Sequence, residues 1–193
     1  MAAIHSYKEK FEWIRQKLTN LHERRHVSTF TDIGCSAGLT SLLAHDVGYT
    51  TIYSLDHDSE YIELLNKIVS LGNRTSSIHP QTFSFGAEFP YKADVVFVGA
   101  LIHWVFTCTA DFGRFDRIMD YIKTAANEVI IIEWVDPNDP AIKSFHHTEC
   151  GATSQEPYDV DGFERALRRV GTIQNRWELP ERRTRVMYTV YLE

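Results

Sequence analysis

Two runs near the middle of the sequence are almost entirely apolar: ADVVFVGAL at 93–101 and EVIIIEWV at 128–135. Continuous apolar runs of this length, rich in valine and isoleucine, indicate β-strands that are buried on both faces. Such strands occur in parallel sheets whose two faces are covered by helices. The chain is therefore expected to fold around a mostly parallel sheet with helices between its strands.

Three further segments fit strands of the same sheet. VSTFTDIG at 27–34 and TTIYSLD at 50–56 are rich in β-branched and aromatic residues. SIHPQTFSFG at 77–86 has room for a short strand after Pro80, because proline cannot donate a hydrogen bond within a sheet. Helical patterns follow these strands, and residues 5–19 place apolar side chains three or four apart, which predicts an N-terminal helix.

The end of the chain departs from this alternation. TIQNRWELP and TRVMYTVYLE predict two strands with a short connection, which can pair as an antiparallel hairpin. The predicted fold class is therefore α/β: a Rossmann-like, doubly wound sheet of seven strands that ends in an antiparallel hairpin.

The bulk properties narrow the class of protein. A chain of 193 residues fits one domain, and a net charge of −6 gives no footprint for a nucleic-acid partner. The arginine-rich region near the end, from ALRRV through ERRTR, is expected to be a solvated face, with a binding patch as the alternative. The three cysteines are far apart in sequence, which favours a reducing, cytoplasmic location. No apolar run approaches the roughly 20 residues of a membrane span, and the N-terminus lacks a secretory signal pattern.

The strongest functional signal is DIGCSAG at 32–38, where the first strand turns into a helix. Gly34 and Gly38 allow a tight turn and a close approach of the backbone to a ligand. A phosphate-binding loop of the GxxxxGK[ST] type is excluded, because no lysine follows Gly38. The spacing also differs from the GxGxxG of nicotinamide-binding proteins, since Ser36 stands where the middle glycine often lies.

A second acid sharpens the interpretation. Asp56 ends the second predicted strand, 22 residues after Gly34, and its carboxylate can accept hydrogen bonds from both hydroxyls of a ribose. Asp32 adds a carboxylate at the tip of the first strand. Acids there suit a cofactor with a positive amino group, the reverse of what a pyrophosphate requires. The alternative for Asp32 is a turn residue that accepts hydrogen bonds from local amides.

On these residues the sequence resembles the class I S-adenosylmethionine-dependent methyltransferases: DIGCSAG is similar to their first motif and YSLDHD to their second. The resemblance runs from about residue 27 to 193. It implies S-adenosylmethionine as cofactor and the strand order 3-2-1-4-5-7-6. It also implies one domain over 1–193, with the helix at 5–19, a cofactor half at 27–100 and an acceptor half at 101–193. The implied cofactor-binding residues are Asp32, Gly34, Cys35, Ser36, Gly38, Asp56, His57, Phe85, Gly86 and Gly99.

The acceptor is expected beyond the fourth and fifth strands. There His103 could take a proton from an acceptor hydroxyl, and Glu133, which interrupts an apolar strand, is the other candidate base. The alternative for His103 is a histidine at a helix start that is satisfied by backbone groups. Aromatic faces suit sugar rings or other flat apolar surfaces. The expected acceptor-binding residues are Trp104, Phe106, Trp134, Asp136 and His146.

No metal site is expected. Metal-dependent relatives place an acid directly after the fourth strand, where this sequence has Gly99 and Ala100. The histidines, glutamate and cysteine within 146–150 do not show the spacing of a zinc finger. The segment NDPAI predicts a helix start, with Asn138 or Asp139 as the cap and Pro140 in the first turn.

Two segments, LIHWVFTCTADFG and IIEWVDPNDPAI, resemble methyltransferase domains attached to glycan-synthesis enzymes, among them multidomain chlorovirus glycosyltransferases that cap rhamnose-containing glycans. This resemblance implies an O-methyltransferase for a sugar hydroxyl, rhamnose included, within a longer protein that would work in the host cytoplasm if it is viral. The open alternatives are a methyltransferase for a small-molecule amine or carboxylate and a cofactor-binding module without catalysis. A nicotinamide-dependent reductase is disfavoured by Ser36 and by the C-terminal hairpin.

Overall fold

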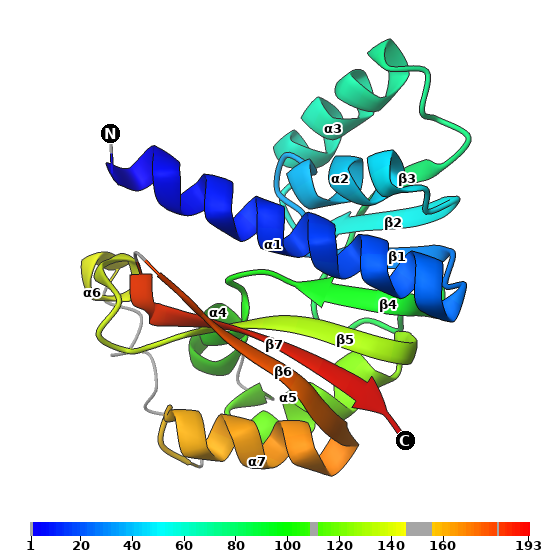
Figure 1. The fold of residues 1–193 in the computed structure, drawn as a ribbon. Coiled ribbons are helices and arrows are strands. Elements are labelled where there is room, and N and C mark those ends of the chain that lie inside the picture. Colours follow the sequence, from blue (N-terminus) through cyan, green and yellow to red (C-terminus); the bar gives the residue numbers. More distant parts are fainter. Residues whose placement is uncertain (1, 109–111, 146–155, 181) are drawn as a thin grey trace. The chain divides into compact units, whose positions relative to one another are not determined.

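The computed structural model describes residues 2–108, 112–145, 156–180 and 182–193. Its seven strands form one sheet in the order β3-β2-β1-β4-β5-β7-β6 (Figure 1). Strands β1, β2 and β3 pair in parallel, whereas β7 pairs antiparallel with both β5 and β6. This confirms the predicted fold class, strand order and C-terminal hairpin. The chain divides into two compact units, 1–97 and 98–193, which are described in turn.

The first unit carries the N-terminal helix and the beginning of the sheet. Its elements are α1 (Ala2–Arg25), β1 (Thr29–Ile33), α2 (Leu39–Val47), β2 (Thr51–Asp56), α3 (Ser59–Leu71), β3 (Ile78–Thr82) and β4 (Ala93–Val98). Helix α1 extends beyond the predicted range of 5–19 at both ends. Strand β3 includes Pro80, which corrects the expectation that the strand begins after it. The sheet tolerates this proline because β3 is an edge strand.

Helix α3 begins at a side-chain cap and buries one apolar face. The Asp58 side chain caps its N-terminus by accepting a hydrogen bond from the Glu60 amide at 2.9 Å. One face of the helix buries Ile62, Leu65 and Val69. A Cβ atom on Gly38 would collide with the Leu65 side chain, so the turn between β1 and α2 packs directly on α3.

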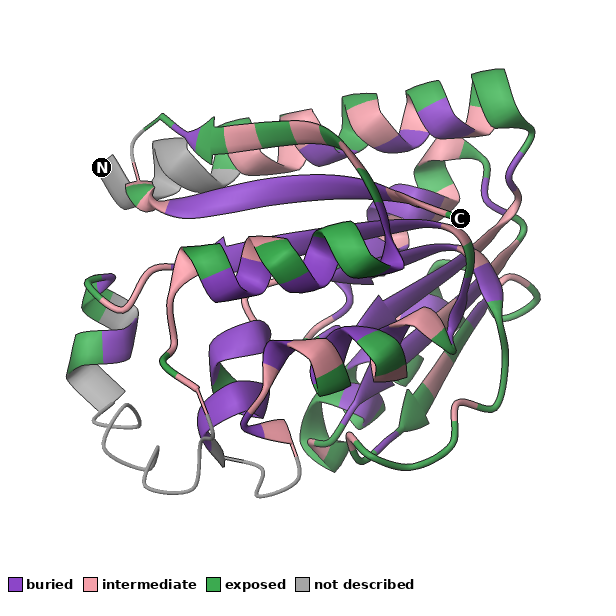
Figure 2. Cartoon of the chain, turned by 90° about the horizontal axis from the view of Figure 1, so that it is seen from below, coloured by how far each residue is buried: buried purple, intermediate pink, exposed green. Residues whose placement is uncertain are grey.

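The second unit is built around the two buried strands β5 (Ala126–Val135) and β7 (Arg182–Leu192). Both are buried over most of their length (Figure 2). The edge strand β6 (Gly171–Leu179) instead alternates in exposure. The helices of this unit are α4 (Ile102–Cys108), α5 (Phe115–Lys123), α6 (Pro140–Phe145) and α7 (Val160–Val170). Among the described helices, none is both long and apolar enough to cross a lipid bilayer.

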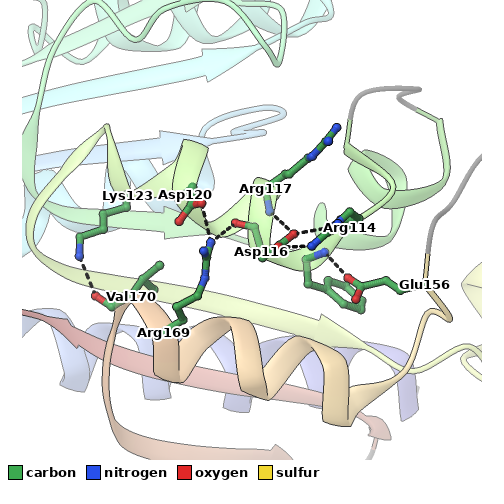
Figure 3. A network of polar contacts seen from close by, with 9 residues as sticks. Arg114, Asp116, Arg117, Asp120, Lys123, Glu156, Arg169 and Val170 are labelled. Carbon is green, nitrogen blue, oxygen red and sulfur yellow. Dashed lines mark hydrogen bonds and ion pairs between the residues drawn. The ribbon is translucent and has the colours of Figure 1, made fainter.

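Polar contacts join α5 to α7 (Figure 3). The Arg169 guanidinium donates to the Asp116 carbonyl at 2.8 Å and pairs with the Asp120 carboxylate. Lys123 Nζ donates to the carbonyl of Val170, the last residue of α7, at 3.2 Å. Arg168 pairs with Glu164 and Arg176 with Glu178. Acids thus lie beside Arg168, Arg169 and Arg176, whereas Arg185, later in the same arginine-rich region, is buried, which corrects the expectation of a solvated face at that position.

Candidate functional site

The turn between β1 and α2 has an unusual backbone that is tied to the end of β2. Gly34, Ser36 and Gly38 all have positive φ, at 75°, 48° and 79°. The amides of Gly34 and Cys35 both donate to the Leu55 carbonyl, at 2.8 and 3.0 Å. Two of the three positions are glycine, for which this conformation carries no steric cost. For Ser36 the conformation carries a steric cost, and it directs the Ser36 amide toward the end of β2.

The Asp56 carboxylate lies where this turn meets β2. Its Oδ2 accepts from the Ser36 amide at 2.7 Å, and its Oδ1 accepts from the Asp58 amide at 3.0 Å. His57 Nδ1 is 3.3 Å from Oδ1, and the His57 side chain is exposed. Two amide donors fix the orientation of the carboxylate, and a carboxylate has about four acceptor positions. Asp56 can therefore hold a ligand with hydroxyl groups in addition to its own backbone.

Asp32 is also buried, but its partners differ. Its Oδ2 accepts from the Ser41 hydroxyl at 2.8 Å, and the Ser54 hydroxyl donates to that of Ser41 at 2.7 Å. Burial raises the pKa of Asp32 to about 7; the hydrogen bonds from Ser41 oppose this rise, and the charge of Asp56 adds to it. The carboxylate thus faces α2 from the end of β1.

The segment after β3 carries two of the residues predicted to bind the cofactor, Phe85 and Gly86. Phe85 is half-buried, and Gly86 is exposed with φ at 104°. Phe83 and Phe89, which the sequence analysis did not single out, stack with their centroids 4.9 Å apart.

Cys35, in the turn after β1, is buried, and burial raises the pKa of its thiol. A neutral, buried thiol provides bulk rather than charge.

In the second unit, His103 and Trp104 begin α4. His103 is 5% exposed, and its carbonyl accepts from the Thr107 hydroxyl at 2.7 Å. Trp104 is 38% exposed, with its ring centroid 5.7 Å from that of His103. Gly99 and Ala100 precede the helix and are half-buried, and Ala100 has a positive φ of 48°. The helix start thus pairs a nearly buried imidazole with an exposed indole.

Two of the expected acceptor-binding aromatics lie in the core instead. Trp134 stacks on Tyr158 with centroids 4.5 Å apart and an interplanar angle of 17°, and also on Phe163 at 5.1 Å. Phe106 contacts Phe115 at 4.4 Å. Both Trp134 and Phe106 are nearly inaccessible to solvent. The structure therefore assigns them a packing role, which corrects the expectation that they line an acceptor pocket.

Glu133 is completely buried beside a cation. Arg185 of β7 donates to Glu133 Oε1 at 3.5 Å and to both oxygens of Asp139, at 2.9 and 3.2 Å. Thr184 donates to Asp139 as well, at 2.8 Å. The Asp139 carboxylate, directly before α6, thus binds β7. Glu133 interrupts an apolar strand because Arg185 faces it from the neighbouring strand, and its environment is that of a structural ion pair.

The remaining predicted residues are placed as follows. Asp136 is half-buried, and its Oδ1 accepts from the Asn138 amide at 2.8 Å. His146 lies outside the described residues, as do the other potential ligands within 146–150. In the part of the chain that the structure describes, no three His, Cys, Asp or Glu side chains gather in a way that could hold a metal ion.

Comparisons with known proteins place this geometry in context. No protein-family model matches the chain, and no curated protein matches it. Solved structures do. Magnesium protoporphyrin IX methyltransferase (ChlM) from Synechocystis, solved with bound S-adenosylmethionine, has a TM-score of 0.69 at 12% identity, covering 97% of this chain and 80% of the other. The N-methyltransferase NodS from Bradyrhizobium japonicum has a TM-score of 0.68 at 12% identity, covering 97% and 96%.

A third similar structure is that of WbdD, with a TM-score of 0.69 at 16% identity, covering 94% of this chain and 39% of the other. The chain spans about half the length or less of the first structures that it matches, at 55%, 54% and 40% of their chains. At these identities the likeness concerns the fold. The fold is the Rossmann-like methyltransferase fold. In this chain the candidate cofactor-binding residues lie mainly at the turn after β1, at the end of β2 and after β3.

The buried ion pair gives a prediction about stability. Replacing Arg185 with methionine leaves Glu133 and Asp139 buried without their cation, so we expect the free energy of unfolding to fall by about 3–5 kcal/mol. Arg168→Met removes an exposed pair with Glu164 on one helix and is expected to cost less than about 1 kcal/mol. Urea unfolding of the two variants measures both losses. Equal small losses would show that the Arg185 cluster does not stabilise the fold.

Proposed function

We propose that this chain is an S-adenosylmethionine-dependent O-methyltransferase that acts on a sugar hydroxyl of a glycan. The observation that carries the cofactor assignment is the Asp56 carboxylate, which the amides of Ser36 and Asp58 hold at the end of β2. A carboxylate so oriented suits the two hydroxyls of a ribose. The fold supports the same assignment, because ChlM was solved with S-adenosylmethionine bound.

The residues of the first unit fit such a cofactor. Asp56 would bind the ribose, and the turn at 34–38 would hold the methionine portion together with Asp32. Phe85 and Gly86 would lie beside the adenine, with the Phe83–Phe89 stack supporting that segment. When bound, S-adenosylmethionine supplies a methyl group on a sulfonium, which is a good leaving group. The protein then has to orient the acceptor and assist the loss of its proton.

In the second unit we assign the proton-accepting role to His103 rather than Glu133. Glu133 has no exposed surface and lies against Arg185, whereas His103 retains some accessibility at the start of α4. A sugar hydroxyl is a very weak acid, so its oxygen attacks more readily when a base takes the proton. Trp104, beside His103 and exposed, offers an aromatic face for a sugar ring. Asp136 remains a candidate for hydrogen bonds to the acceptor.

A second acceptor class has its own support. NodS, whose fold this chain shares, is an N-methyltransferase. An amine acceptor that arrives neutral needs no base, so the contribution of His103 distinguishes the two classes.

The proposal also includes that this chain is one domain of a longer glycan-synthesis protein. Its span of 39% of the WbdD chain shows that this fold can occupy part of a longer protein.

The cofactor assignment is tested by calorimetric titration with S-adenosylhomocysteine. Asp56→Ala should weaken binding by about 10- to 150-fold, because the hydrogen bonds to a charged acceptor, worth roughly 1.5–3 kcal/mol, are lost. Asp46→Ala removes an exposed acid of the same unit and should leave the affinity unchanged. Unchanged affinity in Asp56→Ala would remove Asp56 from the site.

The acceptor assignment is tested by a panel of glycans, rhamnosides included, alongside amines and small carboxylic acids. With a sugar acceptor, His103→Ala should lower kcat by about 10²–10⁴-fold with nearly unchanged affinity for S-adenosylhomocysteine. Glu133→Gln is assayed in parallel. Methylation of amines or carboxylates alone would refute the sugar acceptor, and wild-type kcat in both variants would place the base elsewhere.

We also expect that methyl transfer needs no divalent metal, because Gly99 and Ala100 stand where metal-dependent relatives carry an acid. Activity should therefore persist after treatment with EDTA and gel filtration. Loss of activity on treatment, with recovery on adding magnesium or manganese, would contradict this and would make Asp136 a candidate ligand.

A further inference from the structure

Helix α3 carries apolar side chains on two different faces. One face, with Ile62, Leu65 and Val69, is buried. At 100° per residue, a second set forms a stripe along the helix roughly a third of a turn away from that face. Its members recur at intervals of three, four and three residues: Tyr61, Leu64, Ile68 and Leu71.

This stripe is open to solvent. Tyr61 is 44% exposed, Leu64 45% and Leu71 87%, and Ile68 between them is half-buried. Single exposed apolar side chains are ordinary on protein surfaces, whereas four in a line at heptad spacing are typical of a helix that packs against another helix. Within its own unit α3 packs on β2 and β3. The stripe therefore has the form of a second helix-packing surface, which the described residues leave open.

Two opposite charges lie along one flank of the stripe. Glu60 and Lys67 are seven residues apart, which is about two turns, on the flank that points away from the buried face. Both residues are exposed, and neither side chain forms an ion pair within the described part of the chain. The other flank borders the buried face, where Leu65 is inaccessible to solvent.

This arrangement is complementary to a second copy of the same helix. When two helices pair antiparallel through the same face, each flank lies against the same flank of the other helix. Glu60 of one copy would then lie beside Lys67 of the other, and the twofold symmetry forms this pair twice. In a parallel pair the charged flank would meet the opposite flank, which here borders the buried face. The charges therefore favour the antiparallel direction.

We propose that α3 forms an antiparallel contact between two copies of this chain, with the stripe at its centre and two Glu60–Lys67 pairs along its flank. The contact is independent of the proposed enzymatic activity. Helix α3 has 13 residues and is therefore about 20 Å long, so the helix pair alone buries less than the roughly 1,200 Å² of a stable interface. The dimer is expected to be weak, with a dissociation constant on the order of micromolar or higher.

Sedimentation equilibrium of the whole chain tests this contact. The wild-type mass should rise with concentration from 22.3 kDa toward twice that value. Leu64→Glu places a charge within the stripe and should keep the chain at the monomer mass over the same concentrations. Ser70→Glu is the matched control, because it adds the same charge at an exposed position on another side of α3. This control should dimerise as the wild type does.

Charge variants test the direction of the pairing, and their exposed positions keep the test available if Leu64→Glu does not fold. Glu60→Lys and Lys67→Glu each bring like charges together twice, so each should raise the dissociation constant by about tenfold. The double variant restores opposite charges and should return the constant to near the wild-type value. Thermal unfolding at a concentration where each variant is monomeric shows that the fold is retained.

Three results would overturn the proposal. A wild-type chain that stays monomeric at every concentration would leave the stripe to a different partner. Dimerisation that persists in folded Leu64→Glu would place the interface elsewhere. Single charge variants without effect, or without recovery in the double variant, would refute the antiparallel pairing of Glu60 with Lys67.

Discussion

The candidate cofactor site depends on the attachment of the first turn to the end of β2. Three successive amides of the turn, those of Gly34, Cys35 and Ser36, donate to acceptors on Leu55 and Asp56. These hydrogen bonds hold the backbone in a left-handed conformation that Ser36 would otherwise avoid. In return, the Ser36 amide orients the Asp56 carboxylate. The site is therefore rigid before any ligand arrives, which lowers the entropy that binding has to offset.

The same attachment explains why two nearby acids behave differently. Asp56 accepts from the Ser36 and Asp58 amides, whereas Asp32 is held by Ser41 of α2. Burial raises the pKa of Asp32 to about 7, against the hydrogen bonds from Ser41. In the second unit, Glu133 and Asp139 share Arg185, so their burial is compensated by a fixed cation.

Much of the fold was predictable because it follows from patterns of local sequence. Continuous apolar runs gave β4 and β5, and the alternation of strands and helices gave the parallel part of the sheet. The strand order required the family resemblance, since pairing partners are not encoded in periodicity. The error at Pro80 arose because the edge position of β3 is a property of the whole sheet. The turn at 34–38 was predictable because glycine and aspartate at those positions have specific backbone requirements.

The acceptor residues were harder to predict, because a polar or aromatic residue at a strand end has several possible partners. Glu133 looked like a catalytic acid in an apolar strand, yet its register opposite β7 brings it beside Arg185, which lies 52 residues later in the chain. Trp134, the next residue, points to the other side of the strand and meets Tyr158 and Phe163. A strand that alternates between an ion pair and an aromatic core has no side chain left for an acceptor at these two positions. Among the described residues, the proposed acceptor site is therefore confined to the start of α4 and Asp136.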